Sequence, residues 1–349
     1  MHRARPRRSP RPPGRSRATL AALAALSMLS ACSPGDAESD ERTTPTPTTV
    51  PAPVATTADA TPAADNTSAT QETESATDDG AEDTADDTDD GAEDTADDTA
   101  DGAEDAAVAG RPCEVGPVPA VAGLDPFYVQ GCDLAGFWVV AGEGVDPEAV
   151  TQAAALADAF LGPDPVLARA VLDSGVRLGV IGATQQVTDM PEYRDLPEVF
   201  PDVDWNARAR GLGSTAARPL VSAGEENLLC LDGDRYRGED ILLHEFAHTL
   251  HLQGLAIVDP DFDDDLLAAY TAAMAEGIWV DTYASTNPEE YWAEGVQSYF
   301  ERNLSAVVAD GIHGPIDTRQ ELADADPALF ALIDERFASV RLPPTCQDP

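Results

Sequence analysis

Residues 243–251 read Leu-His-Glu-Phe-Ala-His-Thr-Leu-His. His244 and His248 are four positions apart, so on a helix both side chains project from the same face and can bind one metal ion. Neutral imidazole is a preferred ligand of zinc. Glu245 lies beside that face, where its carboxylate can accept a proton from a water that the metal activates. The stretch therefore predicts a zinc-binding helix, around which the rest of the domain is arranged.

A zinc site of this kind needs a third protein ligand and an open position. His251 is on the same helical face, but seven residues of helix separate it from His244 by about 10 Å along the axis. Bonds of about 2.1 Å from one ion cannot reach both residues on a straight helix. We therefore expect His251 to lie beside the ligands rather than among them. His313, in a Gly-Ile-His-Gly-Pro stretch that is typical of a loop, is a less favoured ligand.

A stronger candidate lies in residues 283–294, which read Tyr-Ala-Ser-Thr-Asn-Pro-Glu-Glu-Tyr-Trp-Ala-Glu. Asn287 can cap a helix whose first position is Pro288. Glu290 and Glu294 then share one helical face, so one can bind zinc while the other accepts the free N–H of a ligand histidine. Glu290 also stands three residues after the cap, as a capping-box residue does. The local sequence leaves these two roles open.

Together, the motif at 244–248 and the stretch 283–294 resemble the catalytic domain of the anthrax lethal factor family, a group of gluzincin metallopeptidases. The resemblance covers roughly residues 235–303. It implies a zincin-like fold, one Zn²⁺ per chain and hydrolysis of peptide bonds with Glu245 as the base. It does not identify a substrate.

The resemblance also implies a role for individual residues. The zinc ligands are then His244, His248 and Glu290, with Glu294 placed on His244. Tyr283 matches the tyrosine whose hydroxyl stabilises the oxyanion or assists the leaving group. The alternative for Tyr283 is a packed aromatic residue without a chemical role.

Residues 111–349 mix aromatic, branched and charged residues and can bury one core. From about residue 238 onward the pattern is helical. We predict an α+β fold, with a small mixed sheet packed on the motif helix and a mainly helical C-terminal part. The predicted elements before the motif are strands at 136–141 and 176–181, a third strand within 218–229 at an edge of the sheet, and helices at 147–161 and 165–172.

The N-terminal residues 1–31 have the pattern of an export signal. Seven arginines precede an apolar run at 20–29 that is too short to span a membrane comfortably. The tetrapeptide Leu-Ser-Ala-Cys at 29–32 is similar to the lipobox of bacterial lipoproteins. We therefore predict a lipoprotein signal peptide over 1–31 and a lipid anchor at Cys32, on the extracytoplasmic side of the cell membrane. The alternative is ordinary cleavage next to an incidental cysteine.

Residues 32–110 form a linker rich in Ala, Thr, Asp and Glu, with an 11-residue repeat that starts at Gly80, Gly91 and Gly102. Positions 33–110 contain 23 acidic residues and one arginine but no large apolar cluster. Such a segment cannot offset the entropy of ordering, so we predict disorder and a spacer role. A calcium-binding array is the less favoured alternative.

Four cysteines remain after Cys32, and an even number in an exported domain favours two disulfides. Three pairings are possible. We favour Cys113–Cys132 and Cys230–Cys346, because the first two cysteines are close in sequence. Buried free thiols are the alternative.

The formal net charge of −43 makes nucleic-acid binding unfavourable, because such a chain repels phosphate backbones. The expected partners are a peptide or protein substrate and, through the anchor, the membrane. The sequence thus predicts a surface-anchored zinc metallopeptidase, an endopeptidase. Two alternatives stay open: an inactive, zinc-containing surface binding module, and a structural lipoprotein with a fortuitous motif.

Overall fold

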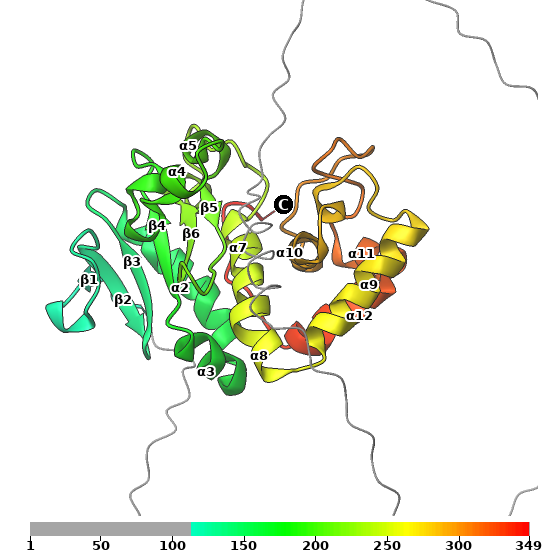
Figure 1. The fold of residues 1–349 in the computed structure, drawn as a ribbon, viewed down its shortest axis with the longest axis horizontal. Helices are drawn as coiled ribbons and strands as arrows, with labels where there is room; N and C mark the ends of the chain where they lie inside the picture. The colour runs from blue at the N-terminus through cyan, green and yellow to red at the C-terminus, as the bar shows by residue number, and fades with distance from the viewer. Residues whose placement is uncertain (1–112, 349) are drawn as a thin grey trace, which may run out of the picture. The chain divides into compact units, whose positions relative to one another are not determined.

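The computed structural model describes residues 113–348 (Figure 1). The predicted signal peptide, the lipid anchor at Cys32 and the linker over 32–110 lie outside these residues. The described part is mixed α/β, with one small sheet and many helices. Within 113–348, no helix combines the length and the apolar character needed to cross a membrane.

Six strands of the described residues form one mixed sheet, in the order β1-β2-β3-β4-β6-β5. The three strands β3, β4 and β6 run parallel to one another, and the remaining pairs are antiparallel. The strands are β1 (Gly116–Pro117), β2 (Gln130–Leu134), β3 (Phe137–Ala141), β4 (Arg177–Ile181), β5 (Gly211–Leu212) and β6 (Leu220–Gly224).

Both faces of the sheet are buried, and β3 shows how its sequence serves both. Successive side chains of a strand point to opposite faces. Phe137 and Val139 enter the larger core, which the sheet shares with the long helices. Val140 enters a second core on the other face, together with Tyr193 and Trp205. A strand buried on both faces reads as a continuous apolar run, as residues 137–141 do.

On the side of the larger core, helices pack in two groups, whereas the short helices α4 (Leu196–Val199) and α5 (Trp205–Arg208) contribute to the second core on the other face. One group lies directly on the sheet, and a second group, made of C-terminal helices, lies beyond α7 (Figure 1). The helices are α2 (Pro147–Leu161), α3 (Pro165–Asp173), α4 (Leu196–Val199), α5 (Trp205–Arg208), α6 (Glu225–Leu228), α7 (Ile241–Leu250), α8 (Ala256–Val258), α9 (Phe262–Glu276), α10 (Pro288–Tyr299), α11 (Arg319–Ala325) and α12 (Pro327–Phe337). A π-helical turn (His251–Leu255) joins α7 to α8, and 3₁₀ turns lie at Ala120–Ala122, Val187–Asp189, Pro191–Tyr193 and Tyr283–Ser285.

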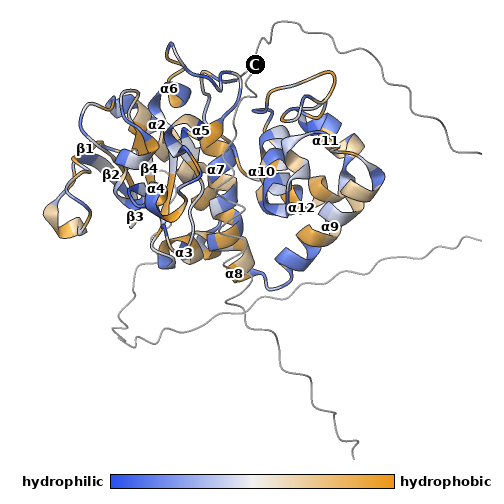
Figure 2. Ribbon diagram, turned by 45° about the horizontal axis from the view of Figure 1, so that its top comes forward, coloured by the Kyte–Doolittle hydropathy of each residue, from blue (hydrophilic) through white to orange (hydrophobic). Residues whose placement is uncertain are grey.

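Helix α9 packs against the core along one stripe of side chains. Its buried residues Phe262, Leu266, Ala269 and Ala273 are spaced by four, three and four positions, which places them in one stripe. Blue and orange segments therefore alternate along α9 in Figure 2. The other side of the helix carries exposed acidic residues, beginning in its first turn.

The coarse prediction agrees with the structure for two strands and two helices before the motif, to within about two residues at each end. The third predicted strand corresponds to β6, but its predicted place at the sheet edge was wrong. The two-residue strand β5 pairs with β6 on its outer side, and α6 occupies 225–228. A strand of two residues leaves no periodic signal in the sequence, so β5 was missed.

Both predicted cysteine pairs lie at disulfide distance. The Cα atoms of Cys113 and Cys132 are 5.6 Å apart, and those of Cys230 and Cys346 are 6.0 Å apart. The first pair ties the start of the described chain to β2. The second ties the C-terminal tail to the turn after α6, close to the segment that leads into α7.

Removal of the second disulfide is expected to destabilise the domain more than removal of the first. The bridged residues are 116 positions apart in Cys230–Cys346 and 19 apart in Cys113–Cys132. The loop-entropy model then gives losses of about 5 and about 3 kcal/mol in the free energy of unfolding. Denaturant unfolding of the paired Cys→Ser variants measures both losses. A larger loss for Cys113–Cys132 would contradict this ranking.

Candidate metal centre

The motif lies on α7, and Asp240 determines where this helix begins. The Asp240 carboxylate accepts a hydrogen bond from the Leu243 N–H at 3.0 Å, which caps the first turn. The same carboxylate forms a buried ion pair of 3.0 Å with Arg302, from the segment after α10. Phe246 and Leu250 are fully buried and anchor the helix between the sheet and α10. The start of α7 is thus held by both its own cap and a distant arginine.

Helix α10 supplies the third side chain of the site. The side chain of Asn287 accepts the Glu290 N–H at 2.8 Å, and Pro288 occupies the first helical position. The cap is therefore made by Asn287, while the Glu290 carboxylate points to the histidines instead of back to the cap. Trp292 donates its indole N–H to the Ala247 carbonyl at 3.0 Å, which fixes α10 against α7.

Three side-chain atoms from these two helices converge on one point. His244 Nε2 lies 3.1 Å from Glu290 Oε2, and His248 Nε2 lies 3.2 Å from the same oxygen. The two Nε2 atoms are 3.2 Å apart. Each of the three residues is at most 2% exposed. Within 113–348, this is the group of histidine and acidic residues whose ligand atoms can hold a metal ion.

The spacing of these atoms fits a tetrahedral zinc ion. Two ligand atoms at about 2.0–2.1 Å from such an ion are about 3.3–3.4 Å from each other. The three observed separations are slightly below that value, so a small outward movement accommodates the ion. Two imidazoles and one carboxylate are also a donor set that zinc accepts, and they leave the fourth position open.

The charges of the cluster are strongly coupled. Burial opposes the charged imidazolium of His244, but the hydrogen bond and charge of Glu290, with Glu245 and Glu294, outweigh it and raise its pKa to about 10. Burial likewise opposes the charged carboxylate of Glu290, but both histidines outweigh it and lower its pKa to about 2. In the metal-free protein, the carboxylate is thus paired with a proton that a metal ion would replace.

Glu245 lies between the cluster and the edge strand of the sheet. A Cβ built on Gly211 would be 3.1 Å from Glu245 Cγ, and one built on Gly213 would be 3.4 Å from Glu245 Oε2. Glycine at both positions therefore lets the chain pass close over α7. Burial raises the pKa of Glu245, while His244 and His248 and a backbone hydrogen bond from Gly213 act against this rise. A buried carboxylate with a raised pKa is suited to accept and return a proton.

Tyr283 is at the cluster as well. Its hydroxyl lies 3.4 Å from Glu290 Oε1, the carboxylate oxygen that does not face the histidines, and its ring centroid is 6.3 Å from that of His244. The Tyr283 N–H donates to the Ile312 carbonyl at 2.8 Å, which ties the start of its 3₁₀ turn to the loop after α10. The tyrosine is half-buried, with its hydroxyl near the ligand atoms.

Two side chains of α10 approach the other nitrogen of His244. Glu294 Oε1 lies 3.5 Å from Nδ1, as the predicted position beside His244 requires. Gln297 Oε1 is closer, at 2.8 Å, and the sequence analysis missed it. The signal that could have revealed Gln297 is its spacing, because residues 290, 294 and 297 share one helical face.

The remaining two candidates have acidic partners of their own. His251 Nε2 is 2.9 Å from Asp263, and its ring packs against Phe262, so it lies beside the cluster and is not a member. His313 Nε2 is 3.0 Å from Glu239, in the segment before α7. Neither histidine therefore replaces Glu290 in the group of three.

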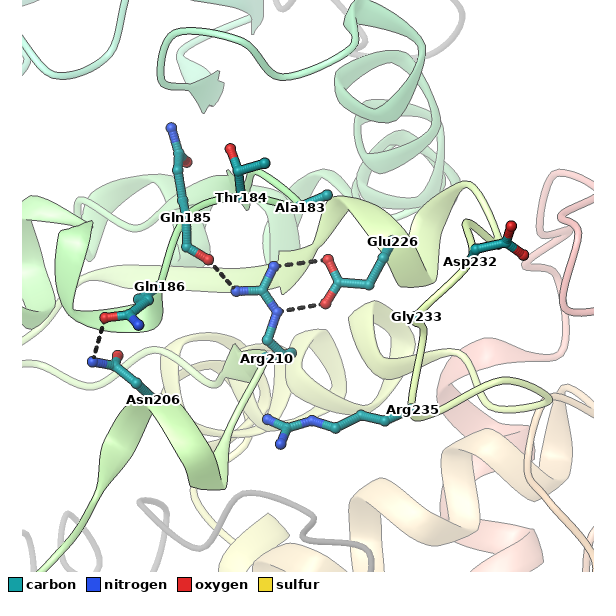
Figure 3. Close-up of a pocket in the computed structure, with 10 residues that line it drawn as sticks. All are labelled: Ala183, Thr184, Gln185, Gln186, Asn206, Arg210, Glu226, Asp232, Gly233 and Arg235. Atoms are coloured by element: carbon teal, nitrogen blue, oxygen red, sulfur yellow. Dashed lines mark hydrogen bonds and ion pairs between the residues drawn. The ribbon is translucent and has the colours of Figure 1, made fainter.

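A separate hollow of about 420 Å³ lies near the start of β5 (Figure 3). The Arg210 side chain extends across the hollow and forms a bidentate ion pair with Glu226. In this pair, Arg210 Nη2 and Glu226 Oε2 are 2.7 Å apart. The same guanidinium donates to the carbonyls of Gln185 and Gly182. Its charge is matched by the protein, so this arginine joins three segments of the fold and offers no unpaired charge to a ligand.

Comparisons of the chain with protein-family models, curated proteins and solved structures gave no match.

Loss of Glu290 is expected to remove zinc from the protein, while loss of Glu294 is expected to weaken binding without abolishing it. The reason is that Glu290 shares the ligand triangle, whereas Glu294 only approaches His244 Nδ1. Elemental analysis of Glu290→Ala and Glu294→Ala after zinc loading measures the stoichiometry. Zinc retained in the first variant and lost in the second would reverse the ligand assignment.

Zinc binding at pH 7 is expected to release about one proton, because a ligand histidine must be neutral and His244 has a pKa of about 10 in the metal-free protein. Below that pKa, the apparent affinity should rise with pH by about tenfold per unit from this group. Calorimetry in two buffers of different ionisation enthalpy counts the protons. A binding enthalpy independent of the buffer would contradict the expectation.

Proposed function

We propose that this protein is a zinc metallopeptidase that cleaves internal peptide bonds. One observation carries the proposal: Glu245 and Tyr283 lie around the same buried triangle of His244, His248 and Glu290. A purely structural metal site is usually closed by four protein ligands. Three ligands with a carboxylate as base and a phenol as hydrogen-bond donor are a set suited to hydrolysis.

His244, His248 and Glu290 would hold a zinc ion, which would lower the pKa of water and polarise a peptide carbonyl. Glu245 accepts the proton of the attacking water and then passes it to the amine that leaves. Its raised pKa supports this exchange, because a base that is too weak would not take the proton. The close approach of Gly213 restrains the carboxylate of Glu245 from the side of the sheet edge.

Tyr283 donates a hydrogen bond from its hydroxyl to the carbonyl oxygen as that oxygen becomes negative. Its position 3.4 Å from Glu290 Oε1 supports this role, because the hydroxyl can reorient without leaving the site. A positioned donor of this kind typically contributes about 10²–10³ in rate. The backbone bond from Tyr283 to Ile312 limits how far the ring can move.

We further propose that the domain is a zincin of the lethal factor-like group. A helix with both histidines and the base, a later helix with the third ligand and a small mixed sheet beside the first helix support this assignment. The strand β5 passes over Glu245 and, among residues 113–348, pairs with β6 alone. Such a strand suits an extended peptide substrate that adds backbone hydrogen bonds at its other side.

The place of action is proposed from the sequence. A lipid anchor at Cys32 would hold the domain on the extracytoplasmic side of the membrane, and the acidic linker over 32–110 would separate the two. A linker of this length spans on the order of 50 Å as a flexible coil. The substrate is then a peptide or protein within reach of the cell surface.

Replacement of the base tests the proposed reaction. The Glu245→Gln variant is expected to keep its zinc but to lose peptidase activity by a factor of about 10²–10⁴, because the amide cannot accept the proton. Cleavage of a mixed peptide library, followed by mass spectrometry, measures activity, and elemental analysis provides the control. A zinc-loaded wild type that cleaves no peptide would favour the alternative of an inactive binding module.

A further inference from the structure

We propose that Gln297 is the positioning residue of the metal centre, and that its amide oxygen holds the proton of His244 on Nδ1, so that Nε2 is the nitrogen that binds the metal. The proposal goes beyond the peptidase assignment, because it concerns the ligand and not the reaction. Gln297 is fully buried on α10, and its Oε1 lies 2.8 Å from His244 Nδ1.

The orientation of the Gln297 amide follows from its other contacts. Its nitrogen lies 3.2 Å from the Asp240 carbonyl oxygen and 3.5 Å from that of Arg302. A carbonyl oxygen can only accept, so the group that faces both carbonyls has to be the NH₂ donor. The reversed amide would place three oxygens together and face its NH₂ group toward His244. The contacts thus determine which end of the amide faces His244.

The protonation of His244 follows in turn. Gln297 Oε1 can only accept, so Nδ1 carries the hydrogen of the 2.8 Å bond. In a neutral imidazole, the other nitrogen then presents its lone pair. That nitrogen, Nε2, is the atom that faces His248 and Glu290. The glutamine therefore both orients the ring and selects the nitrogen that points to the metal position.

The neutral amide of Gln297 binds His244 Nδ1 without changing the net charge of the site. The usual partner of a ligand histidine is a carboxylate, a backbone carbonyl or water. Glu294 is present, but its Oε1 is 3.5 Å from Nδ1, and its other oxygen accepts a hydrogen bond from Asn303 at 3.0 Å. Gln297 thus makes the short bond without adding a negative charge to a buried site that already holds Glu245 and Glu290.

The second histidine lacks any such support. The Nδ1 atom of His248 is buried and has no hydrogen-bond partner among residues 113–348. His244 is therefore the ligand histidine whose ring orientation is fixed by a hydrogen bond at Nδ1. Its partner is well placed for that task, since the Gln297 amide is tied to the Asp240 carbonyl, at the residue that caps α7.

The test compares Gln297→Met with Gln253→Met in the full chain. Both glutamines are buried, and Gln253 lies on the π-helical turn outside the ligand triangle, so it controls for the loss of a buried amide. The chain has five histidines, so nitrogen-15 labelling gives few signals. The readouts are the Nδ1–H resonance of His244, with and without zinc, and the zinc dissociation constant. Thermal unfolding of the metal-free proteins checks that both variants fold.

In wild type and in Gln253→Met, we expect a protected Nδ1–H signal for His244 and, with zinc, coordination through Nε2. Gln297→Met should lose this protection and raise the zinc dissociation constant about 10- to 100-fold. In Glu294→Ala, which removes the rival acceptor at 3.5 Å, the Nδ1–H signal should persist. This variant separates the positioning role of Gln297 from a merely structural one and also answers the question if Gln297→Met fails to fold.

Two results would overturn the proposal. The first is a protected Nδ1–H signal and a zinc affinity in Gln297→Met that match those of Gln253→Met. The second is a larger loss of both in Glu294→Ala, which would make that carboxylate the partner of His244. Protection of the Nδ1–H reports its hydrogen bond to Gln297 and needs no peptidase activity, so it decides the proposal even if the peptidase assignment fails.

Discussion

The structure of the site depends on one constraint: three ligand atoms from two helices have to meet within about 3.2 Å in a buried place. An α-helix can bring two of them together by a spacing of four residues. The third has to come from a helix more than forty residues later in the chain. The register between α7 and α10 is therefore the geometric requirement of the site, and the Trp292 hydrogen bond to the Ala247 carbonyl helps to set it.

Bringing these three ligand atoms together in a buried place also has an electrostatic cost. A buried carboxylate and two buried imidazoles are unfavourable unless protons or a cation compensate them. In the metal-free protein, the raised pKa of His244 and the lowered pKa of Glu290 show that a proton on His244 compensates the charge of the Glu290 carboxylate. A divalent cation would replace that proton and satisfy all three atoms at once. The Asp240–Arg302 pair and the tail disulfide then hold the start of α7, so that the triangle persists without relying on the metal alone.

Local chemistry explains which parts could be predicted from the sequence. The helix with the motif, the Asn287 cap, the long helices and the cysteine pairs follow from residues that are neighbours or carry strong signals. The approach of Glu290 to the histidines needed a family resemblance, because its spacing also fits a capping box. The strand β5 and the partner role of Gln297 were missed, because both arise only when distant segments pack together. The signal peptide, the linker and the lipid anchor concern residues outside 113–348 and stay predictions.

Anomalous diffraction at the zinc edge, from crystals of the zinc-loaded protein, tests the ligand triangle most directly. We expect one ordered zinc ion, at about 2.0–2.2 Å from His244 Nε2, His248 Nε2 and one oxygen of Glu290, with an open fourth position. Zinc bound through Glu294 in place of Glu290, or held only at the acidic surface, would contradict it.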